Sequence, residues 1–228
     1  MSKFALVSVA SIVALGSASA ALADFHTTYT DATNDLFDNG FGNLDIESVT
    51  VHQVDDGSDW QLSISVTTRA WSDWTKYMVF MNLYGVDAAS SNPWNRPVDL
   101  NGASINTYFG AWVDGAGGAQ AWSHSPADGW MLWGSATPAI DAASRTMTLS
   151  LGSVSYEDAA NFFFDFDVAT SGGGNDPGVD HLSRSDMATT GWGTASVAGS
   201  FLHYQALPSP GAIALLGLAG LAARRRRN

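Results

Sequence analysis

Regular alternation of apolar and polar side chains is the feature that most constrains the fold of this chain. Residues 60–67 place an apolar side chain at every second position, and residues 146–151 and 162–168 repeat the pattern. A period of two is that of a β-strand with one buried face. Residues 77–84 are almost entirely apolar, as in a central strand buried on both faces. These segments predict an all-β protein.

Turn chemistry separates the predicted strands. Asp56-Gly57 is a hairpin signal between the strand around Val49 and the strand that starts at Trp60. The alternation breaks at Glu47-Ser48, which predicts a β-bulge. Further strands are expected near residues 106–112, 119–122, 130–136 and 200–206, and a short turn at 156–160. About eight to ten short strands without a βαβ rhythm predict an antiparallel β-sandwich of the jelly-roll type.

Composition agrees with an all-β fold and argues against two classes of function, thiol catalysis and nucleic-acid binding. The acidic residues are 20 Asp and two Glu, and Asp favours turns whereas Glu favours helices. The chain has no cysteine, so neither disulfides nor thiol catalysis is available. Five of the ten basic residues, Lys3 and 224–227, lie in terminal segments without acidic residues. The middle therefore carries five basic against 22 acidic residues, a formal charge of −17, which disfavours nucleic acid as a partner.

Residues 1–23 have the features of a secretory signal peptide. Lys3 precedes a short apolar run over residues 4–15, and Ala21-Leu22-Ala23 forms an A-x-A cleavage site. Cleavage there would begin the mature chain at Asp24, and residues 18–20 offer a second site. An N-terminal membrane anchor is the alternative, but the apolar run is shorter than the ~20 residues of a span.

The C-terminal segment, residues 208–228, has three parts. A Pro-x-Pro-Gly sequence precedes an apolar run over residues 212–223, and a basic cluster follows. As a helix, the residues from Gly211 onward would cover only about 20 Å of a ~30 Å hydrocarbon layer, and the basic cluster would stay in the cytoplasm. The motif residues are Pro208, Ser209, Pro210, Gly211, Arg224, Arg225, Arg226 and Arg227.

These residues resemble the PEP-CTERM sorting signal that exosortases read. The resemblance implies an exosortase as processing partner, a transient membrane anchor in the C-terminal helix, and final location at the cell surface or in the extracellular matrix. Ser209 replaces the family's usual Glu, which leaves the exosortase subtype open. A sortase signal is a rival, but Pro210 occupies the position of its cleaved Thr. A glycolipid-anchor signal would lack the terminal arginines.

The segment between Asp31 and Val51 carries a second resemblance. Acidic turns lead into Leu-Asp-Ile-x-x-Val-x-Val, which is similar to the opening of DOMON-like and family-9-like carbohydrate-binding sandwiches. The resemblance implies a β-sandwich that binds carbohydrate.

Oxygen-bearing side chains are concentrated in two segments, residues 31–45 and the glycine-rich residues 171–181. Neither matches an EF-hand. Carboxylates crowded in the first segment repel one another unless water solvates them or a cation lies between them. The pattern predicts a calcium site, and the alternative is a solvated, charged loop. The predicted ligands are Asp31, Asp35, Asp38 and Asp45.

Several of the nine tryptophans are candidates for ligand binding. Trp60 keeps phase with Leu62 and is expected in the core. Others occur in polar, turn-rich sequence, where an exposed indole can stack on a sugar ring or a partner protein; the alternative is that they cap the ends of the sandwich. These candidates are Trp71, Trp74, Trp94 and Trp192.

Common catalytic and nucleotide-binding motifs are absent from the sequence. Asp165 and Asp167 share one face of a predicted strand, where they could act as a glycosidase pair or, more simply, be solvated. We therefore expect residues 24–207 to form a non-catalytic β-sandwich that binds polysaccharide or matrix partners. A secreted hydrolase acting on extracellular glycans through Asp residues, and a purely structural surface protein, remain alternatives.

Overall fold

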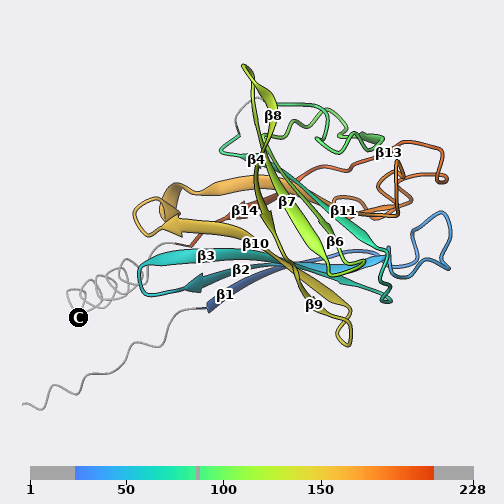
Figure 1. Cartoon of the computed structure of the whole chain (residues 1–228), viewed down its shortest axis with the longest axis horizontal. Helices are drawn as coiled ribbons and strands as arrows, with labels where there is room; N and C mark the ends of the chain where they lie inside the picture. The colour runs from blue at the N-terminus through green and yellow to red at the C-terminus, as the bar shows by residue number, and fades with distance from the viewer. Residues whose placement is uncertain (1–23, 86–87, 208–228) are drawn as a thin grey trace, which may run out of the picture.

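The computed structural model describes residues 24–85 and 88–207 as an all-β structure of two antiparallel sheets (Figure 1). The predicted signal peptide (1–23), the sorting segment (208–228) and the helices expected in them lie outside the described residues. Within the described residues, the helical structure does not reach the length and apolarity of a membrane span.

The first sheet, here called sheet A, has five strands. Its order places the N-terminal strand at one edge and a three-residue strand at the other. Across the sheet the strands are β1 (Asp24–Thr30), β2 (Ile46–Asp55), β3 (Asp59–Thr68), β10 (Thr146–Ser155) and β9 (Ala139–Asp141).

The second sheet, sheet B, has seven strands. Two of the seven, the short strands β12 and β14, pair with different stretches of β11, so that β14 lies outside the linear order of the other six. The order across the sheet is β12 (Asp180–His181), β11 (Phe163–Ser171), β4 (Lys76–Leu83), β6 (Thr107–Trp112), β7 (Gly118–Ser125) and β8 (Gly129–Ala136). The remaining elements are β14 (Leu202–Gln205), a parallel pair of β5 (Val98–Asp99) with β13 (Ser196–Val197), and a 3-10 turn η1 (Ala159–Asn161).

The local signals of the sequence are confirmed. β2 and β3 form the predicted hairpin, in which Asp55 faces Trp60 across the strands. The Asp56 carboxylate closes the turn by accepting hydrogen bonds from the amides of Ser58 and Asp59, at 2.9 and 2.7 Å. The pairing register shifts between Ile46 and Ser48, where the bulge was predicted. Side-chain oxygens of Asp and positive φ at Gly57 thus set this turn.

The main core lies between the two sheets. The apolar face of β3 is fully buried. In the core, side chains from β2, β3 and β10 of sheet A pack against side chains from β4, β6 and β11 of sheet B. β4 is buried on both faces as predicted: Val79 faces sheet A, whereas Phe80 packs in a second cluster with Leu100 and Ile105 from the segment after β4. That segment therefore covers the outer face of sheet B.

One sequence interpretation is wrong. Asp167 was expected on a solvated strand face with Asp165, but the structure buries Asp167 completely. Its Oδ2 lies 2.6 Å from Nδ1 of His181, so β12 and its loop cover this part of β11. Asp165 remains near the surface and pairs with His203 at 2.8 Å.

Replacing Trp60 by alanine should lower the free energy of unfolding by about 3–5 kcal/mol, because its side chain is fully buried between the sheets. Trp133→Ala is the matched control, since Trp133 is 57% exposed on β8. Urea unfolding of both variants measures the difference. Equal losses would contradict the assignment of Trp60 to the core.

Candidate metal centre and aromatic groove

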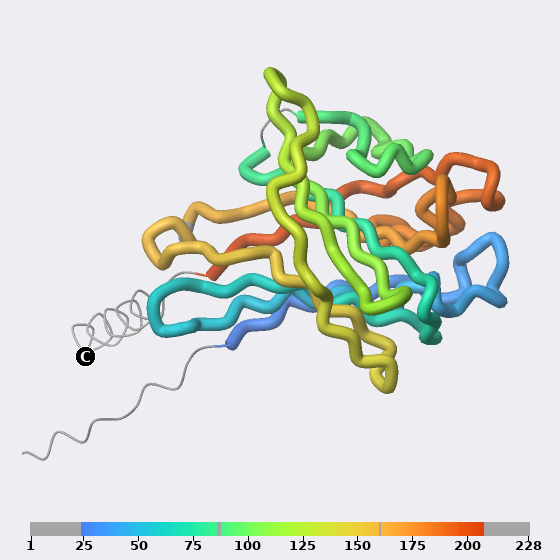
Figure 2. Tube along the Cα trace, in the orientation of Figure 1, coloured from blue at the N-terminus to red at the C-terminus, as the bar shows by residue number. Residues whose placement is uncertain are grey.

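Two segments distant in sequence meet at one end of the sandwich. The β1–β2 connection, residues 31–45, lies at the same end as the residues that follow β11 (Figure 2). Two buried hydrogen bonds link the two sheets here: the hydroxyl of Thr170, near the end of β11, donates to the Leu44 carbonyl, and the amide of Ile46, the first residue of β2, donates to Asp180 Oδ2 at 2.7 Å. Sheet A and sheet B are therefore fastened together here.

Aspartate side chains converge at this junction. Asp35, Asp45 and Asp180 each contribute one carboxylate oxygen to a group in which all three oxygens lie within 4.8 Å of one another. Asp31 is an electrostatic neighbour: burial, followed by the charge of Asp31, raises the pKa of Asp180, and burial, with a smaller contribution from the charge of Asp35, raises the pKa of Asp31. The structure thus brings two of the predicted ligands, Asp35 and Asp45, together with Asp180, which was not predicted.

Hydrogen bonds hold two of these carboxylates in place. Asp45 Oδ2 accepts from Arg69 Nε at 2.7 Å and from the Asn34 amide at 3.0 Å. Asp180 uses Oδ2 for the Ile46 amide and Oδ1 for the His181 amide, at 2.7 and 2.8 Å. The backbone therefore fixes the direction in which both carboxylates point.

Other carboxylate oxygens are buried without a hydrogen-bond partner. They are Asp31 Oδ2, both oxygens of Asp35, and Asp45 Oδ1. Burial, reinforced by neighbouring carboxylates, raises the pKa of Asp31 to about 8 and raises the pKa values of Asp35 and Asp180. A buried, unpaired carboxylate is costly, so this arrangement calls for a proton or a cation.

Asp38 does not join the group. It is exposed, and its Oδ1 accepts from the Gly40 amide at 2.9 Å within its own turn. Asp180 was missed as a ligand because it lies 135 residues after Asp45 in the chain. The signal was present, since the second oxygen-rich segment contains it, but only the topology shows that the two segments form one site.

Aromatic side chains cover the same junction. Leu36, Leu44 and Val179, each adjacent in sequence to one of the three clustered aspartates, form a small apolar cluster. Phe37 and Phe41 pack edge-on against Trp192, with ring centroids 5.3 and 5.1 Å apart. The remaining member is Trp74, 6.2 Å from Phe41. Trp74 and Trp192 thus both contact Phe41 in this cluster, and Trp71 packs against the main core.

Trp94 has a different setting. It lines a groove of about 320 Å³ on the face of sheet B that points away from sheet A. The Trp94 ring lies over Gly110, and Trp112 lies over Gly118; a Cβ at either glycine would overlap the ring. The two ring centroids are 6.4 Å apart. The groove is lined by Lys76, Trp94, Arg96, Trp112, Gln120 and Gly174.

Polar contacts fix the groove. Trp94 Nε1 donates to Gln120 Oε1 at 2.7 Å, and the Arg96 guanidinium lies 5.7 Å from the centre of the Trp94 ring. Arg96 also donates to the carbonyls of Gly172, Gly173 and Asp176. The loop after β11 is therefore bound to the groove on one side and leads to Asp180 on the other.

A Ser–His–Asp chain of hydrogen bonds lies behind this loop. His181 Nδ1 is 2.6 Å from Asp167 Oδ2, and its Nε2 is 3.0 Å from Ser196 Oγ. Sequence reasoning missed this set, because its members come from three separate strands. The order of groups is that of a catalytic triad, but all three residues are fully buried. The contacts hold β12 and β13 to β11 and leave Ser196 without access for a substrate.

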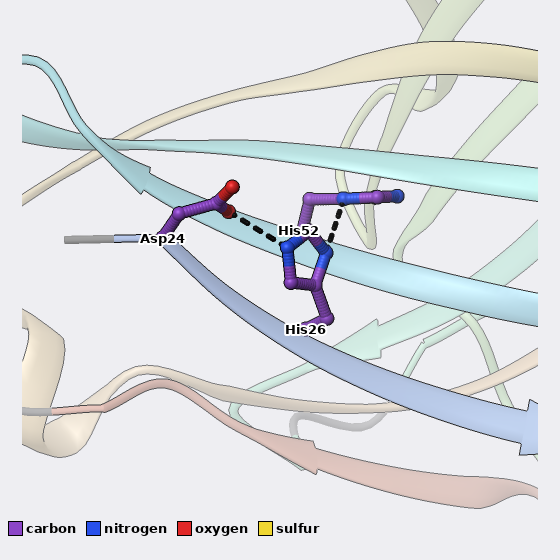
Figure 3. A group of neighbouring side chains, drawn as sticks. All are labelled: Asp24, His26 and His52. Carbon is purple, nitrogen blue, oxygen red and sulfur yellow. Dashed lines mark hydrogen bonds and ion pairs between the residues drawn. The ribbon is translucent and has the colours of Figure 1, made fainter.

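A third group of titratable residues lies on the first two strands (Figure 3). His26 and His52 face each other across β1 and β2 with their Nδ1 atoms 2.7 Å apart. Asp24 Oδ1 is 3.1 Å from the other nitrogen of His26. Burial, followed by the charge of His26, lowers the pKa of His52. The three groups form a hydrogen-bonded chain in this structure, and one ligand atom of each lies within 4.8 Å of the others, so this largely exposed group is a second set of side chains that could hold a metal ion.

A cavity of about 330 Å³ lies between the sheets beside Trp133 and is lined mainly by apolar residues, among them Leu62, Phe109 and Phe164. Its described lining includes no charged side chain, so it offers neither acid–base nor metal chemistry.

No protein-family model matches the chain, and no curated protein or solved structure is significantly similar to it.

The metal-free protein should become less stable as the pH rises from about 4 to about 8, and this contribution should level off above that. The pKa of Asp31 is about 8 in the folded chain, whereas an unfolded Asp titrates near ~3.9. The folded state therefore holds a proton that the unfolded state has lost, and this stabilisation disappears above the folded pKa. Melting temperatures in chelator test this. Asp31→Asn should flatten the dependence, and identical slopes in both proteins would refute it.

Proposed function

We propose that this chain is an exported, non-catalytic surface protein that binds neutral polysaccharide through the groove containing Trp94. The observation that carries the proposal is the pair of indoles, Trp94 and Trp112, each packed against a glycine beside polar side chains, with ring centroids 6.4 Å apart and ring planes inclined at 45°. Pyranose rings offer apolar faces to aromatic rings and hydroxyls to flanking polar groups. The groove combines both kinds of contact.

The polar groups of the groove are suited to forming hydrogen bonds with the hydroxyl groups of a sugar. Gln120 Oε1 already accepts from the indoles of Trp94 and Trp122, so its amide nitrogen is the group left for a ligand. Lys76 Nζ is bound to Asp114 at 2.7 Å, which neutralises its charge. With a formal charge of −17 on residues 24–207, the domain repels anionic polymers. These features favour a neutral glycan.

The remaining parts of the proposal concern sorting and architecture. The segments at 1–23 and 208–228 support export, exosortase processing and release to the cell surface or matrix. The crossovers from β3 to β4 and from β10 to β11 move the chain between sheets, which supports a jelly-roll-like sandwich. The groove lies on the face of sheet B that points away from sheet A.

A glycan hydrolase acting through Asp165 and Asp167 receives less support. A carboxylate pair must face one substrate, but Asp167 is buried against His181, whereas Asp165 lies near the surface with His203. Assaying reducing ends released from any bound polysaccharide distinguishes a hydrolase from a binding protein.

Trp94→Ala should weaken polysaccharide binding about ten- to thirtyfold, equivalent to roughly 1.4–2 kcal/mol, through loss of the stacking surface. Trp133→Ala, which changes an exposed indole outside the groove, should bind normally. Affinity electrophoresis in gels containing soluble glucan, mannan or xylan provides the measurement, and thermal melting checks each fold. Absence of retention in every gel would favour the purely structural alternative.

Processing makes a separate prediction about the tail. Mature protein released from the cell surface should lack residues 212–228, and replacing Arg224–Arg227 by neutral residues should impair retention and processing, because the basic cluster keeps the C-terminus in the cytoplasm. Mass spectrometry of the released protein tests this. An intact arginine-rich C-terminus in most molecules would contradict the sorting assignment.

A further inference from the structure

We propose that a calcium ion binds between the β1–β2 connection and the start of β12, coordinated by Asp35, Asp45 and Asp180 with Asp31 beside them. This site shares no residue with the proposed polysaccharide groove. It differs from the set predicted by sequence in replacing Asp38, which is held in its own turn, by Asp180 from the other sheet.

A buried oxygen without a partner is the first support. Asp45 has a side-chain exposure of 0%, and only its Oδ2 receives hydrogen bonds. Its Oδ1 is buried without a partner, in the group that also contains oxygens of Asp35 and Asp180. Both oxygens of Asp35 are in the same condition. These oxygens have lost water without gaining a donor, which is the condition that a cation relieves.

Charge balance is the second support. The four aspartates carry up to four negative charges, and Arg69 is the cation that contacts them directly, through Asp45 at 2.7 Å. Arg184 offsets only a small part of the burial that raises the pKa of Asp35, and its guanidinium pairs with Asp186 at 2.8 Å. A divalent ion would offset most of the remaining negative charge.

Ligand type and spacing select calcium among divalent cations. The clustered ligand atoms are carboxylate oxygens, and calcium binds oxygen at about 2.3–2.6 Å, so two of its ligands are at most about 5 Å apart. The observed limit of 4.8 Å fits that span. Calcium also tolerates the irregular geometry of two loops and accepts backbone carbonyls, whereas magnesium requires a near-octahedral shell at about 2.1 Å.

Asp35→Asn gives the sharpest test, because neither oxygen of Asp35 makes a hydrogen bond that the substitution could break. The full chain, purified in mild detergent and freed of metal, would be titrated with calcium chloride by calorimetry and melted with calcium or chelator. At a hundredfold excess over the dissociation constant, calcium should raise the melting temperature by about 5–10 °C. Asp35→Asn should lower calcium affinity at least tenfold yet raise the melting temperature in chelator, since it removes a repelling charge.

Asp38→Asn is the matched control, since it removes an equal charge from the same segment outside the site. It should leave calcium affinity and both melting temperatures unchanged. Three results would overturn the proposal: no binding heat and no shift at millimolar calcium, equal effects of the two substitutions, or the same stabilisation by magnesium chloride. None of these depends on polysaccharide binding, so the two proposals fail separately.

Discussion

The hydrogen bond from the Ile46 amide to the Asp180 carboxylate joins the first residue of β2, in sheet A, to the first residue of β12, in sheet B. It places an acidic group inside the end of the sandwich, where Thr170 and Leu44 make a second link between the same chain segments. Once Asp180 is fixed there, Asp35 and Asp45 lie beside it. The accumulation of buried carboxylates at this end of the molecule therefore follows from how the two sheets are connected.

The chain has no cysteine, so polar contacts must hold the long connections to the sheets. His181 does this at the centre, bridging Asp167 on β11 and Ser196 on β13. Arg96, which is also buried, does it beside the groove, where its guanidinium donates hydrogen bonds to three carbonyls of the loop after β11. Buried networks of this kind are stable only when each polar atom has a hydrogen-bond partner or a counter-charge. The aspartate group does not meet this condition by itself, because several of its carboxylate oxygens have no partner.

Local pattern was sufficient to predict most of the longer strands, the Asp56-Gly57 hairpin and the bulge before Ser48, because each depends on residues close in sequence. The seven-residue strand β1 was not predicted, because most of its side chains are exposed and no buried alternating face marks it. The two-residue strands β5, β12 and β13 carry no such pattern and form only because neighbouring segments cover sheet B. The same limit applies to the site. Sequence predicted Asp31, Asp35 and Asp45 from their proximity in the chain, but the choice between Asp38 and Asp180 depends on which loop packs against β2. The burial of Asp167 depends on the same packing.

The loop between β11 and β12 connects the two proposed sites physically. Its first half supplies the carbonyls that hold Arg96 and places Gly174 at the rim of the groove. Its second half ends at Asp180, and glycines leave its backbone with much conformational freedom to lose on ordering. A cation that fixes Asp180 against Asp45 would restrict one end of this loop, while Arg96 restricts the other. Ordering of the loop by the ion would then reduce the entropic cost of shaping the groove, although the ion itself does not contact the groove.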